Sequence, residues 1–180
     1  MKLRTLLLGV GLALATVTAQ AADPQVYFSR SDKVAGIVVR EIDAAQKSIH
    51  VLIYSLTDDD IADALLRAAA RGVDVKIVMD RTQAAGKEAL DERLLARLGP
   101  KRFIYRTGKG RGVMHEKMAI FDGLTVTLGS YNWTENARDN NWENLIVLRD
   151  ATLAARCTAE FQRVWTSPAP RESKPKAGAK

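Results

Sequence analysis

Apolar residues follow two alternating spacings along the chain. In four segments they recur every third or fourth position, which predicts amphipathic helices over residues 31–47, 57–72, 87–99 and 151–165. Between and around these segments lie short runs rich in valine, isoleucine and leucine, typical of buried strands, at residues 48–56, 73–80, 102–106 and 144–150. The alternation predicts an α/β fold in one domain, with a mixed, mostly parallel β-sheet flanked by helices.

The first two predicted helices carry start signals. Ser31 is placed to cap the first helix, and Thr57 with Asp60 forms a capping pair for the second, which ends at Gly72. The acidic run at residues 58–60 could be imagined as a metal site. We interpret it as part of the helix start instead, because acidic side chains are favourable at a helix N-terminus.

The two ends of the chain differ from its middle. Residues 1–21 have basic residues, an apolar run over 6–17 and Ala19-Gln20-Ala21, which is typical of a secretory signal peptide. A membrane anchor is the alternative, but the run is shorter than the roughly 20 apolar residues needed to span a bilayer. We therefore expect a secreted or periplasmic protein with no stable membrane association after cleavage, a domain over 22–167 and a disordered basic tail over 168–180.

Charge is informative locally rather than globally. The formal net charge is +6, but most of this excess belongs to the leader and the tail. Residues 101–117 carry six basic side chains against one acidic, and such a patch attracts phosphate-bearing ligands. Within it "RTGKGRG" lacks the spacing of a Walker loop, so we expect a flexible basic loop in which Lys109 and Arg111 contact substrate. A merely solvated loop is the alternative.

The segment "HEKMAIFDGLTVTLGSYN", residues 115–132, predicts a β-hairpin that carries chemistry. Side chains on a strand alternate faces, so His115 and Lys117 share one. If Asp122 and the glycine after it form a two-residue turn, Ser130 and Asn132 fall on the same face. The predicted pairs are Phe121 with Leu124, Lys117 with Leu128, and His115 with Ser130.

These residue types suit phosphate chemistry. Lys117 can neutralise phosphate oxygens, Ser130 and Asn132 can donate hydrogen bonds to them, and His115 can act as nucleophile, base or acid. A carboxylate is needed to hold the imidazole tautomer, and the downstream "WEN" offers Glu143. Asp122 falls at the turn, away from this patch, where we expect a mainly structural role.

Other candidate ligand residues favour a structural interpretation. His50 lies in an apolar strand, and Cys157, the one cysteine, lies in a predicted helix and cannot form an intramolecular disulfide. No Cys/His cluster has zinc spacing, so we expect no metal and no cofactor. The aromatics Tyr131, Trp133 and Trp142 flank the hairpin and could either stack on bases or pack in the core.

The hairpin also fits the H-x-K-x4-D-x6-G-S-x-N signature of the phospholipase D superfamily, and "WEN" resembles the Glu-Asn of its small, single-motif bacterial endonucleases. The resemblance extends over roughly residues 25–166. It implies a phospholipase D-like sandwich and two-step phosphodiester hydrolysis without metal. His115 would form a phosphohistidine, and Lys117, Asn132 and Ser130 would hold the phosphate. Glu143 would orient His115.

The resemblance further implies a homodimer. The chain carries one motif, and small members of the family form the site between two chains, so His115 of a second copy would protonate the leaving oxygen. We expect the substrate to be nucleic acid, favouring DNA over RNA and without strong sequence preference. A phospholipid phosphodiesterase and a non-catalytic nucleic-acid-binding module are the alternatives.

Overall fold

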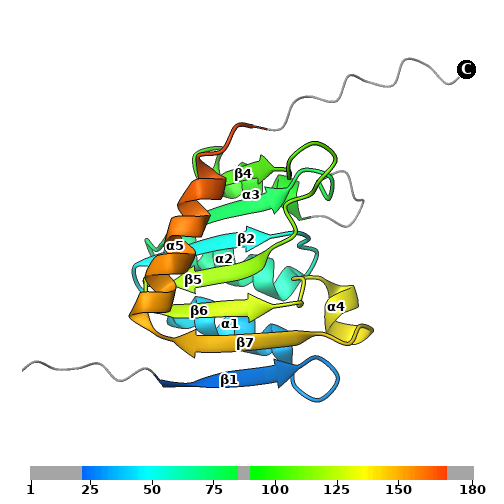
Figure 1. The fold of residues 1–180 in the computed structure, drawn as a ribbon, viewed down its shortest axis with the longest axis vertical. Coiled ribbons are helices and arrows are strands. Elements are labelled where there is room, and N and C mark those ends of the chain that lie inside the picture. Colours follow the sequence, from blue (N-terminus) through cyan, green and yellow to red (C-terminus); the bar gives the residue numbers. More distant parts are fainter. Residues whose placement is uncertain (1–21, 85–89, 170–180) are drawn as a thin grey trace, which may run out of the picture.

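The computed structural model describes residues 22–84 and 90–169, which form a seven-stranded sheet with helices on both faces (Figure 1). The predicted signal peptide and all but the first two residues of the predicted tail lie outside the described residues. The strands are β1 (Ala22–Phe28), β2 (Ser48–Ile53), β3 (Asp74–Asp80), β4 (Phe103–Arg106), β5 (Lys117–Phe121), β6 (Thr125–Gly129) and β7 (Asn144–Arg149). The helices are α1 (Val34–Ala44), α2 (Asp59–Ala70), α3 (Asp91–Leu98), α4 (Glu135–Asp139) and α5 (Ala151–Trp165).

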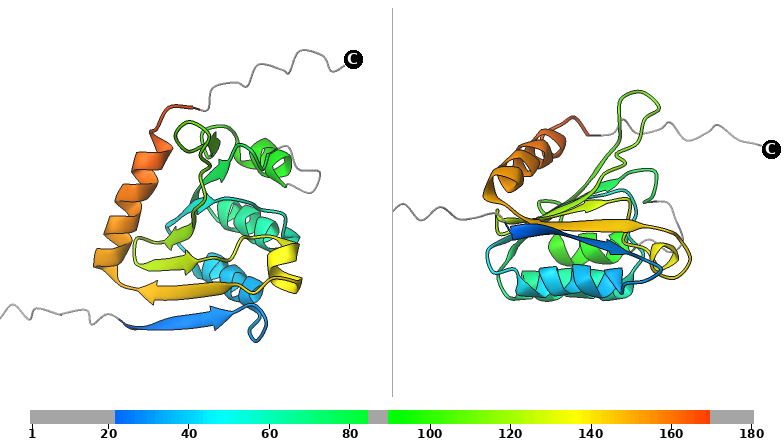
Figure 2. Two further views of the ribbon diagram at one scale, coloured as in Figure 1. Left: turned by 45° about the vertical axis from the view of Figure 1, so that its right-hand side comes forward. Right: turned by 60° about the horizontal axis from the view of Figure 1, so that its bottom comes forward.

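Helices α1, α2 and α3 cover one face of the sheet, and α5 crosses the other (Figure 2). Alternate residues of β2 supply the two cores: Ile49, Val51 and Ile53 join the larger core under α1 to α3, whereas Leu52 joins the smaller core under α5. Each such fully buried side chain contributes about 1.5–3 kcal/mol to folding. Within the described ranges, no helix is long and apolar enough to cross a bilayer.

The strand order is β1-β7-β6-β5-β2-β3-β4. In the described part of the chain, β2–β3 and β3–β4 are the parallel pairs, and the four other pairs are antiparallel. The α/β class and the mixed sheet are confirmed, but the expectation of a mostly parallel sheet is wrong. Hairpin β5–β6 and the β6–β7 connection, which contains α4, join antiparallel neighbours and so need no crossover between parallel strands. Strand β1, which the apolar pattern does not predict, adds another antiparallel pair.

The helix starts differ in detail from the predicted ones. Helix α1 begins after Lys33, so the predicted Ser31 cap is wrong; the chain first makes a turn at the end of β1, in which the N–H of Ser31 donates to a β1 carbonyl. Helix α2 is capped by Asp58 rather than Thr57, because the Asp58 carboxylate accepts a hydrogen bond from an N–H of the first turn. The acidic run therefore does cap the helix, as expected.

The hairpin turn is centred on the predicted residues, but its register is not the predicted one. Asp122 and Gly123 both have positive φ, 54° and 66°, and the N–H of Leu124 donates to the carbonyl of Phe121 at 3.0 Å. The ladder then resumes with Thr125 opposite Phe121, so Leu124 is an extra residue in the turn.

This extra residue displaces each predicted pair by one position. Met118, and not Lys117, lies opposite Leu128. The three predicted pairs are therefore wrong, and alternation along the two strands cannot by itself place Ser130 beside His115.

Asp122 fastens the hairpin to the loop between α1 and β2. Its carboxylate accepts hydrogen bonds from the backbone N–H groups of Gln46, Lys47 and Ser48 at 3.0, 2.7 and 2.9 Å. Burial alone would raise the pKa of the Asp122 carboxyl, but these hydrogen bonds outweigh it and hold the pKa below its ordinary value. Lys117 lies at the other end of β5, about 17 Å away at roughly 3.4 Å per residue, which supports a structural role for Asp122.

We predict that Asp122→Asn lowers the free energy of unfolding at pH 7 by about 1–2 kcal/mol, the scale of hydrogen bonds to a charged acceptor. Asparagine tolerates the positive φ of this position, so the substitution removes the negative charge without straining the backbone. Because the folded-state pKa is depressed, the carboxylate stabilises the fold above its unfolded pKa of about 3.9, and this contribution is lost as pH falls through the folded pKa. Urea unfolding from pH 7 to pH 3 should show the two proteins converging. The exposed Asp23→Asn is the control; a difference independent of pH would contradict the assignment.

Candidate active site

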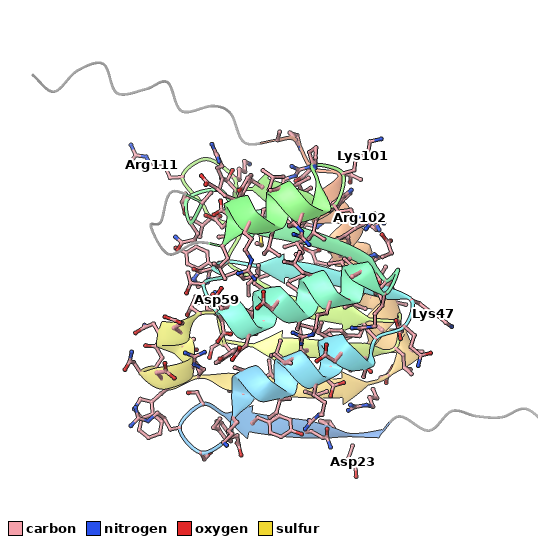
Figure 3. All side chains as sticks on the ribbon, turned by 180° about the vertical axis from the view of Figure 1, so that it is seen from behind. Asp23, Lys47, Asp59, Lys101, Arg102 and Arg111 are labelled. Atoms are coloured by element: carbon pink, nitrogen blue, oxygen red, sulfur yellow. The ribbon has the colours of Figure 1, made fainter. Side chains whose placement is uncertain are left out.

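The predicted site residues gather at one edge of the sheet, where β2 and β3 end and β5 begins. Because β5 is antiparallel to β2, with Ile53 opposite Lys117, the first residues of β5 reach the edge at which β2 ends. In Figure 3, which views the molecule from behind, this edge is on the side of the labels of Asp59 and Arg111. The carboxyl ends of parallel strands are a common place for ligand sites in open α/β sheets.

His115 and Lys117 lie in contact. The Lys117 ammonium is 3.2 Å from Nδ1 of His115 and donates to the His115 main-chain carbonyl at 2.9 Å. The ring of Tyr54, just past β2, lies against both: its centroid is 4.5 Å from that of the His115 ring and 4.9 Å from the Lys117 Nζ. The Nε2 of Gln83 donates to the Tyr54 hydroxyl at 2.8 Å, which fixes the ring. The sequence did not indicate Tyr54, because a tyrosine after an apolar run has no distinctive signal.

The contact indicates which nitrogen of His115 accepts a hydrogen bond. A lysine ammonium can only donate, so Nδ1 of His115 is the acceptor, and a neutral ring carries its proton on Nε2. Burial lowers the pKa of Lys117, and the negative charge of Glu143 partly offsets this. Lys117 is therefore a partly desolvated cation whose charge acts strongly on a nearby anion.

A second group of polar residues surrounds Glu143. The Ser130 hydroxyl donates to the Glu143 carboxylate at 2.5 Å, and the Asn141 side chain donates to its other oxygen at 3.0 Å. The Ser29 hydroxyl accepts from the Glu143 backbone N–H at 2.9 Å, and Ser130 Oγ accepts from the N–H of Asn144 at 3.1 Å. Of these, Ser130 and Glu143 were predicted. Ser29 and Asn141 were not, because they come from segments without a motif.

The structure brings the two groups to one edge but does not join all predicted partners. Among the described contacts, Glu143 makes no hydrogen bond to His115, so its orienting role stays a prediction; its charge nevertheless acts on Lys117. Asn132 is half-buried, and its Oδ1 has no hydrogen-bond partner among the described protein groups. An unpaired amide oxygen can accept a hydrogen bond, whereas holding a phosphate oxygen would use the Nδ2 donors, so the predicted role of Asn132 also stays a prediction.

Gly129 explains the glycine of the motif. The N–H groups of Ser130 and Tyr131 both donate to the carbonyl oxygen of Asn144, each at 3.2 Å. This close approach leaves no room for a side chain, since a Cβ at Gly129 would lie 2.2 Å from that oxygen. The glycine thus lets β6 leave its ladder where Ser130 must reach Glu143.

The basic run is not one continuous surface. Lys101 and Arg102 lie on the side of the molecule opposite Arg111 (Figure 3). The guanidinium of Arg106 donates to main-chain carbonyls at the end of α5, at 2.6 and 3.2 Å. The expectation of a single basic patch is therefore wrong, because β4 separates its two ends. Lys109 and Arg111 remain exposed on the loop that leads into β5.

A buried carboxylate holds that loop. Asp80, at the end of β3, is fully buried, and it accepts hydrogen bonds from the backbone N–H of Met114 at 2.6 Å and of Thr82 at 2.8 Å. Met114 immediately precedes His115, so Asp80 fixes where the histidine leaves the loop. Sequence inspection did not single out Asp80, since an acidic residue at a strand end is common.

The arrangement can bind and attack an anion. It offers an exposed imidazole, a partly desolvated ammonium, a hydroxyl and a carboxylate at one edge. In residues 22–84 and 90–169, no three histidine, cysteine, aspartate or glutamate side chains gather as metal ligands.

Comparison with known proteins defines the class. Residues 38–165 match the family described as "Cardiolipin synthase, PLD-like domain", so the chain belongs to the phospholipase D-like family. The resemblance carried by the hairpin motif is therefore confirmed.

Two solved structures and two curated proteins illustrate the similarity. Nuc from Salmonella typhimurium, described as a phospholipase D family member, has a TM-score of 0.71 and 33% identity, covering 81% of this chain and 95% of that one. NucT from Helicobacter pylori has a TM-score of 0.74 and 28% identity, covering 82% and 98%. A mitochondrial cardiolipin hydrolase from Chlamydomonas reinhardtii is 33% identical over 123 residues, 68% of this chain and 53% of that protein. A phospholipase D from Rickettsia bellii is 38% identical over 117 residues, 65% and 56%. The chain thus spans about half the length of the curated relatives it matches.

We predict that Gly129→Ala lowers the free energy of unfolding by about 2 kcal/mol or more, because the added methyl group forces β6 away from the Asn144 carbonyl. The matched control is Gly36→Ala in α1, where a Cβ meets nothing within 4 Å. There the better helix propensity of alanine should raise stability by up to about 1 kcal/mol. Urea unfolding of both variants measures the difference, and equal stabilities would show that the approach at Gly129 is not tight.

Proposed function

We propose that this protein is a metal-independent phosphodiesterase that hydrolyses nucleic acid, with DNA as the favoured substrate. The observation that supports this most directly is the contact between Lys117 and His115 at an exposed edge, next to the group formed by Ser130 and Glu143. Lysine supplies the positive charge that a metal supplies in other phosphodiesterases. Membership of the phospholipase D-like family agrees with this chemistry.

In the proposed reaction, His115 attacks phosphorus and the P–O bond to the leaving group breaks. The leaving oxygen takes a proton from a second histidine, and a phosphohistidine remains. That second histidine then removes a proton from water, which attacks phosphorus and breaks the P–N bond. Lys117 and Asn132 hold the phosphate oxygens throughout, with Ser130 in support. Attack through Nε2 requires the ring proton on Nδ1, where Glu143 would accept its hydrogen bond once a phosphate has drawn Lys117 away.

The second histidine must come from another chain. The sequence has two histidines. His50 lies on the α5 side, where its ring stacks on Phe161 at 4.6 Å with an interplanar angle of 8°. Its cross-strand neighbour Lys76 donates to Asp74 at 2.6 Å rather than to the imidazole, unlike Lys117 beside His115, and so we assign His50 a structural role. A homodimer with a two-fold axis through the site would place two His115–Lys117 pairs around one phosphate.

The substrate assignment depends on the loop before β5. Lys109 and Arg111 are exposed at its tip, where they can meet a polyanion that extends beyond the cleaved phosphate. The second candidate is a phospholipid, because the curated relatives include proteins named mitochondrial cardiolipin hydrolase and phospholipase D. The predicted signal peptide would place either activity outside the cytoplasm.

To test the activity, the mature protein is incubated in EDTA with DNA, RNA or cardiolipin vesicles. We expect DNA cleavage at a rate that chelation does not change, since Lys117 and Asn132 replace the metal. His115→Ala should lower the rate by about a thousandfold or more while the protein stays folded. Loss of cleavage in EDTA with recovery in magnesium would overturn the mechanism. Hydrolysis of the vesicles alone would select the lipid candidate.

To test the shared site, wild-type chains are refolded with an increasing fraction of His115→Ala chains. If a site needs two intact histidines, total activity follows the square of the wild-type fraction, so an equal mixture retains about one quarter. Leu124→Ala chains, altered at the far end of the hairpin, are the control and should not reduce activity. A linear fall, or a fully active monomer in light scattering, would assign each chain its own site.

A further inference from the structure

The three aromatic residues near the hairpin have different environments. Tyr131 and Trp133 are buried, with 0% and 2% of their surface exposed, so they pack in the core. Trp142 is 83% exposed, the largest fraction among the large hydrophobic side chains exposed in the described part of the chain. Folding therefore makes almost no use of this indole, although transferring it out of water would be strongly favourable.

The exposed indole is held in a defined place. Its neighbour in the chain is Glu143, whose backbone N–H donates to Ser29 Oγ at 2.9 Å and whose carbonyl accepts from the Ser29 N–H at 3.0 Å. On its other side, the carbonyl of Asn141 accepts from the Ser29 hydroxyl at 2.6 Å. Trp142 thus lies between two anchored residues, and the residue that follows it, Glu143, carries the carboxylate of the candidate active site.

A cation accompanies the indole. The guanidinium carbon of Arg30 lies 5.3 Å from the centroid of the Trp142 ring, and its Nη1 donates to the carbonyl of Asn140 at 3.4 Å. An aromatic face beside a guanidinium, in the residue that precedes Glu143 of the proposed site, matches the chemistry of one nucleotide: the base has a π-face to stack, and the phosphate has negative charge.

We infer that Trp142 is a stacking platform for an unpaired base next to the cleaved phosphate, and that Arg30 binds the backbone of the same strand. This inference rests on the proposed function and narrows its substrate to single-stranded nucleic acid. A base within a duplex is already stacked and paired on both sides, so it reaches an exposed indole only if it is unstacked, at a cost of a few kcal/mol.

The first test measures binding without cleavage. In a His115→Ala background, oligothymidylate should quench tryptophan fluorescence, because a base stacks on Trp142. The quenching should disappear when Trp142→Phe is added and should persist with Trp165→Phe. A deoxyribose-phosphate chain of the same length without bases should leave the emission unchanged. Absence of quenching by oligothymidylate would overturn the inference.

The second test separates the base from the phosphate. We compare kcat/KM for oligothymidylate with that for a deoxyribose-phosphate chain of the same length without bases, in wild type, Trp142→Ala and Trp142→Phe. Stacking contributes about 1–3 kcal/mol per base, so Trp142→Ala should lower the ratio of the two constants by about tenfold to a hundredfold, mainly through KM. Trp142→Phe, which keeps an aromatic ring, should retain most of the wild-type ratio. The exposed Leu124→Ala is the matched control.

Other outcomes would give Trp142 a different role. Equal losses on both substrates would mean that Trp142 only supports Glu143. A dimer that dissociates in light scattering on Trp142→Ala would make it a subunit contact, and a blue-shifted emission with cardiolipin vesicles would make it a membrane contact. Each of these results would overturn the inference about Trp142 but would leave the proposed function standing. If the wild type hydrolyses neither substrate, the proposed function itself fails.

Discussion

The antiparallel pairing of β5 with β2 is the constraint on which the candidate site depends. Strands β2, β3 and β4 run parallel and end at one edge, where a loop leaves each strand. Because β5 runs the other way, its first residue, Lys117, lies opposite Ile53, the last residue of β2. A parallel β5 would carry the same side chains to the far edge. Asp80 and Asp122 secure the two ends of this placement, one by holding the loop before His115 and the other by holding the turn after β5.

The candidate site residues satisfy one another's hydrogen bonds. Lys117 donates to His115, while Ser130 and Asn141 donate hydrogen bonds to the Glu143 carboxylate. Both arrangements are favourable, since a partly desolvated ammonium and a carboxylate each need a partner. In the proposed reaction, a phosphate would compete with His115 for Lys117 through its negative charge. The proposed reaction therefore requires these residues to exchange partners.

Much of the fold followed from sequence, and the failures have identifiable causes. The apolar spacing located strands β2 to β7 and the long helices, because each buries a set of apolar side chains. It missed β1 and α4, because an edge strand and a helix of five residues bury too little to leave a periodic pattern.

The site was predicted as residue types more successfully than as geometry. The sequence pointed to His115 and Lys117 and to Ser130 and Glu143. The structure places the members of each pair in contact. The strand register was wrong because turn length depends on how Leu124 is accommodated, and no alternation rule contains that information. Tyr54, Ser29 and Asp80 were missed since they act through tertiary proximity alone.

The position of Ser29 at the end of β1 has a consequence for how the protein responds to heat. Strand β1 pairs with β7 alone in the described part of the sheet, and it is exposed along most of its length. Edge strands open locally at a lower free energy than the core. When β1 frays, the Ser29 hydroxyl leaves the backbone of Glu143, although the central strands stay folded. Local opening of β1 thus releases the backbone on both sides of Trp142 while Ser130 and Asn141 still hold the Glu143 carboxylate, and amide exchange along β1, rather than the melting temperature of the whole molecule, reports this loosening.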